Sequence, residues 1–103
     1  MAVGMLMAGE GITLDAYKAI SEKMFGNYPM TADQSPEGLI VHTAGNSPMG
    51  FYIYDIWESK EQFLAFAEST IGPAVQELGM DTPIEPTFYE IDVIVGGPVA
   101  VPA

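Results

Sequence analysis

The sequence predicts one α+β domain in which four strands and two helices follow one another in the order βαββαβ. Three observations predict it. Short apolar runs stand near both ends of the chain, two further apolar runs flank a Gly/Asn/Ser/Pro segment in the middle, and helical repeats follow the first and third runs. At 103 residues the chain has the length of a single domain, which we predict to span residues 1–95.

The first third of the chain predicts a strand, a helix and a long loop. Residues 2–8 are rich in Val, Met and Leu, which is typical of a strand buried on both faces. Apolar residues at helical spacing predict a helix over 14–25, with Thr13 as its N-cap and Gly26 as its end. Residues 27–37 hold two prolines and few large apolar groups, and long loops of this kind often serve as lids or binding segments.

The middle of the chain predicts a β-hairpin. Residues 38–44 and 51–57 are apolar and rich in β-formers, and Gly45-Asn46-Ser47-Pro48 between them has the composition of a turn. A turn centred near Ser47 would place His42 opposite Tyr52. These expectations fix which side chains of the two strands share a face.

The second helical region begins at a clear signal. Ser59 and Gln62 match a capping box, with the serine capping the Gln62 amide and the glutamine reaching back. Gly72-Pro73 is predicted to interrupt this helix, and residues 74–78 to continue it at an angle. Together these signals predict a second helix built in two pieces.

The end of the chain predicts the fourth strand and a tail. Residues 87–95 are largely apolar on both sides, as in a strand covered on both faces. Residues 96–103, GGPVAVPA, have no regular period and form a tail that is either disordered or wraps across a partner subunit. The element order is that of the ferredoxin-like split βαβ fold, a four-stranded antiparallel sheet with both helices on one face.

The uncovered face of such a sheet predicts self-association. The strand over 51–57 alternates between two sets of largely apolar or aromatic side chains, and neither set suits water. One set is Phe51, Ile53, Asp55 and Trp57, and the other is Tyr52, Tyr54 and Ile56. Because 49% of all residues are hydrophobic, we predict that the open face meets the same face of a second copy in a two-fold homodimer.

Charge and composition restrict the partners. Fourteen acidic residues against three lysines and no arginine give a net charge of −11, which repels nucleic acid and anionic membranes. Without arginine no side chain can clamp a carboxylate or phosphate in bidentate fashion, so a neutral, hydrophobic small molecule is the expected ligand. The chain has no cysteine, no apolar run of the roughly 18 residues that span a bilayer, and no basic stretch at its start, so a cytoplasmic location is expected.

Three segments carry a resemblance to a known family. They are GMLMAGEGITLDAY near the start, YDIWESKEQFLAFAESTIGPAVQELGM in the middle and PTFYEI near the end. With them the chain resembles the antibiotic biosynthesis monooxygenase-like group of dimeric α+β barrel proteins, and it is most similar to a mostly actinobacterial branch. The resemblance implies the dimeric barrel and a cofactor-independent oxygenase, cyclase or isomerase acting on an aromatic, polyketide-like molecule. The asparagine, tryptophan and histidine of the haem-degrading members are absent from the corresponding elements.

His42 and Asp55 are the candidate catalytic residues. His42 is the only histidine and stands mid-strand, where it could move protons near neutral pH or could simply be satisfied by a backbone carbonyl or the dimer face. With Tyr52 and Tyr54 on its face, it would form a cluster at a cavity between sheet and helices. Asp55 is a carboxylate inside an apolar strand, so it is either functional or paired with a partner that offsets its burial.

Tyr17 and Trp57 complete the predicted substrate-binding set, beside Tyr52 and Tyr54. Trp57 could stack on a flat aromatic ligand or anchor the second helix on the sheet, and Tyr17 could line or plug the same pocket. No metal-ligand spacing, P-loop, Rossmann glycine pattern or GxSxG elbow is present, so no cofactor is expected. The sequence thus allows two functions: a cofactor-free enzyme, or a non-catalytic dimeric binding or structural protein.

Overall fold

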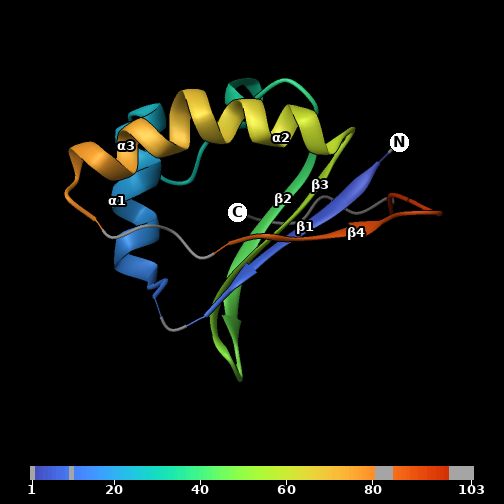
Figure 1. Cartoon of the computed structure of the whole chain (residues 1–103), viewed down its shortest axis with the longest axis horizontal. Helices are drawn as coiled ribbons and strands as arrows, with labels where there is room; N and C mark the ends of the chain where they lie inside the picture. The colour runs from blue at the N-terminus through green and yellow to red at the C-terminus, as the bar shows by residue number, and fades with distance from the viewer. Residues whose placement is uncertain (1, 10, 81–84, 98–103) are drawn as a thin grey trace.

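The computed structural model describes residues 2–9, 11–80 and 85–97 of the chain. Its elements, in chain order, are β1 (Val3–Ala8), α1 (Leu14–Phe25), the 3₁₀ turn η1 (Ala32–Gln34), β2 (Leu39–Ser47), β3 (Gly50–Trp57), α2 (Lys60–Phe66), the π-helical segment η2 (Ala67–Ile71), α3 (Gly72–Glu77) and β4 (Thr87–Glu90). The four strands form one antiparallel sheet in the order β2-β3-β1-β4, and the helices lie on one of its faces (Figure 1). The predicted α+β, ferredoxin-like fold is confirmed.

Helix α1 has the predicted bounds because both of its ends carry local signals. The Thr13 hydroxyl oxygen accepts a hydrogen bond from the Ala16 amide at 3.1 Å, which satisfies one of the amides left free in the first turn. Gly26 has a φ of 81°, in the left-handed region that favours glycine, and its amide closes the helix on the carbonyl of Glu22.

The second helical region starts at the predicted Ser59 cap and has a second piece that begins at Gly72-Pro73, as predicted, but the chain stays helical between the two pieces. The Ser59 hydroxyl oxygen accepts from the Gln62 amide at 3.2 Å and donates to the Gln62 side-chain oxygen at 2.9 Å. Helix α2 then widens into the π-helical segment, where the Gly72 amide reaches back to the carbonyl of Ala67, and continues directly as α3. Because Pro73 has no N–H and its ring crowds an ordinary helical turn, the wider turn lets the chain stay helical.

The hairpin differs from the prediction in both length and register. Strand β2 continues to Ser47, which pairs with Gly50, so the turn is Pro48-Met49 and the predicted turn over 45–48 is wrong. His42 pairs with Asp55 and Gly45 pairs with Tyr52. The prediction failed because small residues with turn composition extend the strand here, and the later turn moves His42 to a different partner.

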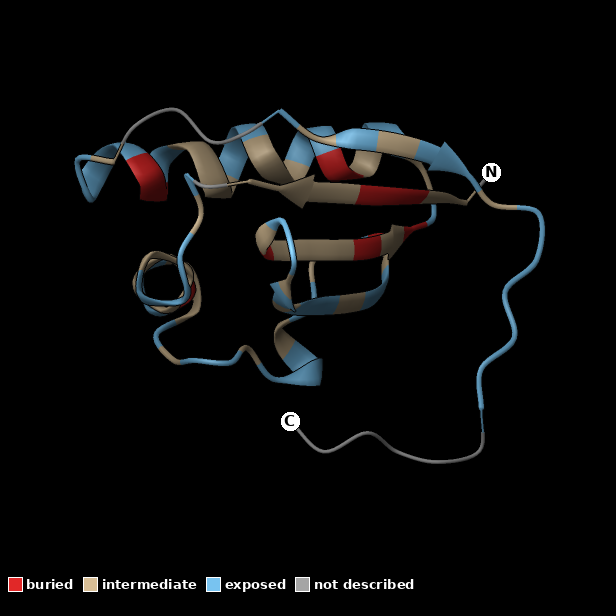
Figure 2. Ribbon diagram, turned by 90° about the horizontal axis from the view of Figure 1, so that it is seen from below, coloured by how far each residue is buried: buried red, intermediate tan, exposed pale blue. Residues whose placement is uncertain are grey.

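Strand β4 is shorter than predicted and only one of its faces is covered. It ends at Glu90, and of its four residues only Phe88 is partly buried and packs against the core. The prediction of a strand covered on both faces over 87–95 is wrong because β4 is an edge strand whose other side belongs to the open face of the sheet. Residues 91–97 leave the sheet as a mostly exposed segment (Figure 2), and most of the predicted tail, 98–103, lies outside the described residues.

The core lies between the sheet and α2. Met5, Trp57 and Phe63 are its buried centre, with exposed fractions of 0%, 1% and 3%. The Trp57 ring packs edge-on against Phe63, with ring centroids 5.4 Å apart, and lies tilted on Phe66. Trp57 therefore anchors the second helical region on the sheet, as one of its two predicted roles required.

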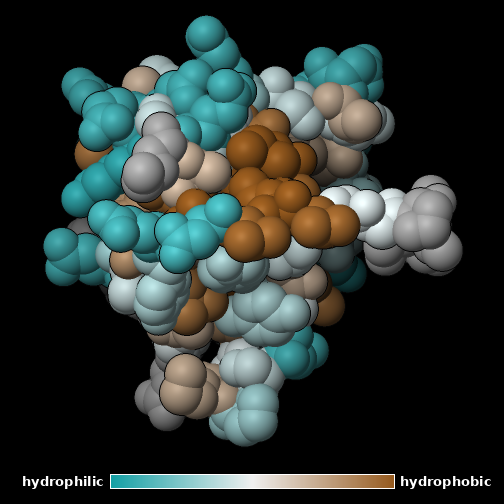
Figure 3. Space-filling model, turned by 90° about the vertical axis from the view of Figure 1, so that its right-hand side faces the viewer, coloured by the Kyte–Doolittle hydropathy of each residue, from teal (hydrophilic) through white to brown (hydrophobic). Residues whose placement is uncertain are grey.

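The opposite face of the sheet carries apolar and aromatic side chains in register. One row crosses all four strands through Val41, Ile56, Gly4 and Tyr89, and the next row through Thr43, Tyr54, Leu6 and Thr87. Neither row contains a charged residue. Val41 and Tyr89 are 43% and 49% exposed, and a continuous hydrophobic area is visible on the side of the molecule where β1 begins (Figure 3). No helix among the described residues is long and apolar enough to cross a membrane.

Candidate functional site

A cavity of about 590 Å³ lies between the helices and the inner face of the sheet. Its wall is almost entirely apolar, and four methionines and five aromatic side chains contribute to it. These are Met5, Met7, Met24, Met30, Tyr17, Phe25, Trp57, Phe63 and Phe66. Aromatic rings offer flat surfaces for stacking and methionines adapt their shape, so the wall suits a flat hydrophobic molecule.

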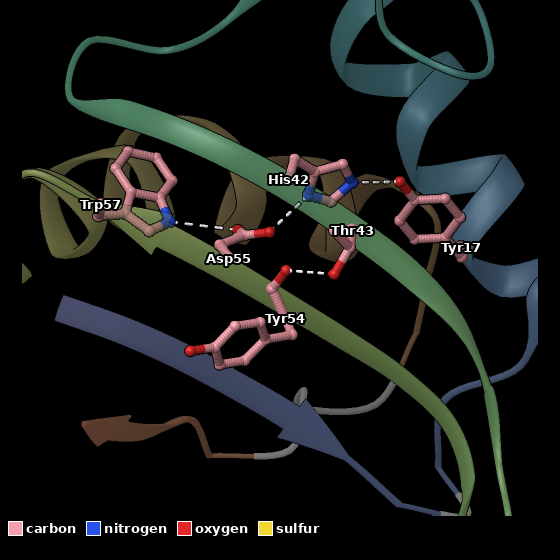
Figure 4. Close-up of polar contacts among 6 residues, drawn as sticks. All are labelled: Tyr17, His42, Thr43, Tyr54, Asp55 and Trp57. Atoms are coloured by element: carbon pink, nitrogen blue, oxygen red, sulfur yellow. Dashed lines mark hydrogen bonds and ion pairs between the residues drawn. The ribbon is translucent and has the colours of Figure 1, made fainter. Parts of the chain in front are cut away.

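A chain of hydrogen bonds supplies the polar part of this wall (Figure 4). The Trp57 indole N–H donates to Asp55 Oδ2 at 3.1 Å. Asp55 Oδ1 lies 2.6 Å from His42 Nδ1, and His42 Nε2 lies 2.5 Å from the Tyr17 hydroxyl. The four side chains come from three elements, α1, β2 and β3, and converge at one place in the cavity.

The backbone explains how they meet. His42 and Asp55 are direct partners of the β2–β3 ladder and share the inner face, where such partners have side chains about 5 Å apart. Asp55 and Trp57 are two residues apart on one strand, so they also share that face. Helix α1 then brings Tyr17 over the end of the imidazole, with the two rings nearly parallel and their centroids 5.9 Å apart.

These contacts fix where the protons lie. A carboxylate only accepts hydrogen bonds, so Asp55 requires that His42 carry its proton on Nδ1. In the neutral imidazole Nε2 is then an acceptor, and the Tyr17 hydroxyl donates to it. Burial above all, and then the charge of Asp55 and the nearby Tyr28, raises the pKa of Tyr17 from 10.0 to about 12. Tyr17 is therefore a neutral phenol at physiological pH, in keeping with its role as donor.

The hydrogen-bonded side chains differ in how far they are buried. Asp55 is only 7% exposed in its side chain, whereas His42 is 23% exposed. Burying a carboxylate costs free energy unless hydrogen bonds offset the loss of water, and Asp55 has two such donors, one on each oxygen. Among the described residues, every buried side-chain nitrogen and oxygen has a hydrogen-bond partner.

The structure brings together four of the six predicted site residues. Tyr17, His42, Asp55 and Trp57 line the cavity. Tyr52 and Tyr54 do not, because they project from the opposite face: a methyl group on Gly45 would touch the Tyr52 ring, and one on Gly4 would collide with the Tyr54 hydroxyl. The predicted cluster of His42 with Tyr52 and Tyr54 is wrong. It followed from the wrong hairpin register, and the partner of His42 is Asp55.

The sequence did not predict which residues of the loop over 27–37 reach the cavity, or how the loop is held in place. Met30 and Pro36 of this loop line the cavity, so the loop forms part of its wall, whereas a role in binding stays a prediction. Paired amide side chains hold it: the Gln34 side-chain N–H donates to Asn27 Oδ1 at 3.0 Å, and the Asn27 side-chain N–H donates to Gln34 Oε1 at 3.1 Å. No short motif marks such a brace in the sequence.

The described residues that line the cavity include no lysine and no arginine, and the acidic residues among them are Asp55 and Glu85. The cavity therefore offers no fixed positive charge to an anionic ligand. In the described part of the chain, no three His, Cys, Asp or Glu side chains are grouped so that they could hold a metal ion. These surroundings suit a neutral, largely apolar molecule better than an anion.

Several solved structures with the same fold are named as candidate antibiotic biosynthesis monooxygenases. No protein-family model matches this sequence, and no curated protein matches it. A candidate antibiotic biosynthesis monooxygenase from Chloroflexus aurantiacus superposes with a TM-score of 0.55 at 19% identity, over 94% of this chain and 96% of that chain. The chain has an antibiotic biosynthesis monooxygenase-like fold.

Two further solved structures have the same fold. Rv0793 from Mycobacterium tuberculosis has a TM-score of 0.56 at 13% identity, over 92% of this chain and 97% of that one. A candidate antibiotic biosynthesis monooxygenase from Deinococcus radiodurans has a TM-score of 0.51 at 16% identity, over 92% and 94%. The resemblance predicted from the sequence is confirmed at the level of the fold, whereas the actinobacterial branch stays a prediction. At these identities the likeness establishes no chemistry.

Proposed function

We propose that the protein is a cofactor-independent enzyme, a monooxygenase or a cyclase- or isomerase-like enzyme, that acts on a hydrophobic aromatic small molecule of polyketide type. One observation carries the proposal: a histidine held by a buried carboxylate stands in the wall of a largely apolar cavity. The names of the Chloroflexus and Deinococcus structures support the monooxygenase version.

The proposed reaction begins with loss of a proton from the bound substrate to the Asp55–His42 pair. Asp55 holds the imidazole in one tautomer and stabilises the imidazolium that forms, which is the usual division of work between a histidine base and its carboxylate. The apolar wall keeps water away from the resulting carbanion or phenolate. In the oxygenase version an activated CH₂ group reacts with O₂ and becomes a carbonyl with release of one water, so the substrate itself supplies all the electrons.

Oxygen uptake tests this proposal. Wild-type protein is mixed with an anthrone in a closed oxygen electrode, and we expect the loss of one O₂ for each carbonyl formed. His42→Ala should lower the rate at least a hundredfold, since general base catalysis typically contributes two to four orders of magnitude. Tyr52→Phe removes a hydroxyl from the opposite face and serves as the matched control with wild-type rate. Steady O₂ with a range of anthrones and quinols would contradict the oxygenase version.

A non-catalytic binding protein is the second candidate. It is favoured by the complete satisfaction of the polar atoms at the site, because a closed hydrogen-bonded chain can serve structure alone. The two functions differ in turnover: a binding protein returns an anthrone unchanged, whereas the enzyme converts it. Trp57, the only tryptophan, stands in the cavity wall and reports binding by its fluorescence in either case.

We further propose that the open sheet face forms a homodimer. It carries two uncharged rows of largely apolar side chains, and Val41 and Tyr89 stand exposed on it. Val41→Lys should raise the dimer dissociation constant at least tenfold in sedimentation equilibrium, because it places a charge within the apolar patch. Met49→Lys at the hairpin turn, where Met49 is 70% exposed, is the matched control. An unchanged dissociation constant in Val41→Lys, or a monomeric wild type, would contradict this interface.

A further inference from the structure

A general base needs a free lone pair that faces its ligand, and His42 has none in this arrangement. His42 has two ring nitrogens, and both are engaged: Nδ1 with Asp55 Oδ1 and Nε2 with the Tyr17 hydroxyl. Asp55 in turn has its second oxygen occupied by the Trp57 indole N–H. In this arrangement a ligand meets neither a free nitrogen on the imidazole nor a carboxylate oxygen without a donor.

Tyr17 is held firmly against His42 in the wall of the cavity. Its ring packs edge-on against Tyr28, with centroids 5.7 Å apart, and tilted against Phe51 at 5.4 Å, while it lies nearly parallel to the imidazole. Three aromatic neighbours thus oppose a swing of the phenol away from His42. Its oxygen gives its single hydrogen to His42 and keeps lone pairs that can accept a hydrogen bond from a ligand.

The charges around the cavity also favour His42 as the final proton acceptor. An anion formed in the cavity needs a positive group nearby, and the described wall holds no lysine or arginine. The imidazolium of His42 is the one cation that the described wall can generate, and Asp55 is placed to stabilise it. A proton that passes from the ligand to His42 binds Nε2, which the Tyr17 hydroxyl occupies.

We propose that Tyr17 is the group that takes the proton from the ligand, while it passes its own proton to His42. This inference rests on the proposed function and assigns the acceptor atom at the same site. The ligand O–H or C–H bond breaks as its proton binds the Tyr17 oxygen, and the Tyr17 O–H bond breaks as its proton binds His42 Nε2. The products are a ligand anion, a neutral tyrosine that donates to that anion, and an imidazolium paired with the Asp55 carboxylate. No electrons are transferred in this step.

Tyr17→Phe separates this path from direct contact with His42. The variant keeps the ring and its three aromatic contacts, so we expect it to fold. If Tyr17 relays the proton, the variant loses the path. If Tyr17 instead blocks His42, the variant frees Nε2 and improves proton removal. A relaying Tyr17 and a blocking Tyr17 therefore predict opposite changes in proton removal when its hydroxyl is deleted.

A monohydroxyanthraquinone is a suitable probe because it is neutral, flat and hydrophobic, and its absorbance changes when its hydroxyl ionises. It is added at a pH two units below the pKa of its free hydroxyl, where binding is followed by quenching of Trp57 fluorescence and ionisation by absorbance. We expect the wild type to bind the probe largely as the anion. Tyr17→Phe should bind with a Kd within about threefold of wild type but with at least a tenfold lower ratio of anion to neutral probe. His42→Gln should lose the anion as well, and Tyr52→Phe should match the wild type.

An equal or higher anionic fraction in Tyr17→Phe would overturn the relay, because the ligand would then reach His42 directly. A wild type that leaves the probe unbound or binds it in its neutral form would overturn it too. Oxygen uptake on the same samples separates the two proposals. Ionisation that depends on Tyr17, without uptake of O₂ by an anthrone, keeps the relay and removes the oxygenase. Uptake that is unaffected in Tyr17→Phe keeps the oxygenase and removes the relay.

Discussion

The two faces of the sheet use neighbouring residues of one strand for opposite purposes. On the inner face of β3, Asp55 and Trp57 are nearly or fully buried, and each polar atom has a fixed partner. On the outer face Tyr54 and Ile56 are partly exposed and lie in rows without a charge. The inner face can thus hold a defined proton arrangement beside a cavity, whereas the outer face offers only area for an apolar contact. Since side chains alternate along a strand, a single register decides both surfaces.

The largest expected effect is the loss of the inner carboxylate. Asp55→Ala leaves the Trp57 indole N–H and the His42 ring without an acceptor in a buried place, and we expect the free energy of unfolding to fall by about 3 kcal/mol. Urea unfolding measures it. Glu58→Ala, on an exposed residue just beyond β3, is the matched control and should change stability by less than about 0.5 kcal/mol. Equal stabilities would contradict the role assigned to Asp55.

Neighbours on β1 allow the same comparison for apolar side chains. Met5 is fully buried on the inner face, so Met5→Ala should cost about 3 kcal/mol in urea unfolding. Leu6 pairs with Tyr54 on the outer face and is only partly buried, so Leu6→Ala should cost about 1 kcal/mol in monomeric protein. Comparable costs at the two positions would show that the outer face is packed as tightly as the core.

Gly4→Ala probes how tolerant the outer face is. A methyl group there would come within 2.5 Å of the Tyr54 hydroxyl, which must move aside. Because a partly exposed ring can shift, we expect a cost of about 1 kcal/mol in thermal or urea unfolding, at the low end for an overpacked site. A cost above about 3 kcal/mol would mean that Tyr54 is held as firmly as the inner-face residues.

The last comparison concerns pH and is specific to the inner site. The unfolded chain ionises Tyr17 near its ordinary pKa of 10.0, whereas the folded protein keeps the proton up to about 12. The contribution of Tyr17 is therefore fully present below pH 10 and is lost as the pH rises from about 10 to 12. Between pH 9 and pH 11.5 the free energy of unfolding should fall more in wild type than in Tyr17→Phe. Equal slopes would contradict the buried, neutral phenol.

Local signals in the sequence predicted most of the fold. Helix α1 has the bounds that Thr13 and Gly26 indicate, because a cap and a left-handed glycine act on the residues next to them. The Gly72-Pro73 signal marks the start of the second helical piece, α3, with Pro73 in its first turn, but a π-helical segment keeps the chain helical up to that point. A Gly-Pro pair indicates that an ordinary α-helical turn cannot form at that point. It does not indicate which other turn forms there instead.

The site was predictable in its residues and only partly in its geometry. A lone histidine and a lone carboxylate in apolar strands marked His42 and Asp55, and both reach the cavity. Their mutual contact was missed because it depends on where the hairpin turns, and the turn lies at Pro48-Met49. The indole N–H of Trp57 as a donor to Asp55 could have been found, because residues two apart on a strand share a face.

The most direct test of this account is the protonation of the only histidine. A long-range ¹H–¹⁵N spectrum of labelled protein near pH 7 contains the ring signals of His42 alone, so it needs no assignment. We expect a single neutral tautomer with the proton on Nδ1, held by Asp55, and Nε2 as acceptor of the Tyr17 hydroxyl. A proton on Nε2, or a mixture of tautomers in fast exchange, would contradict the ordered proton path on which the proposed chemistry depends.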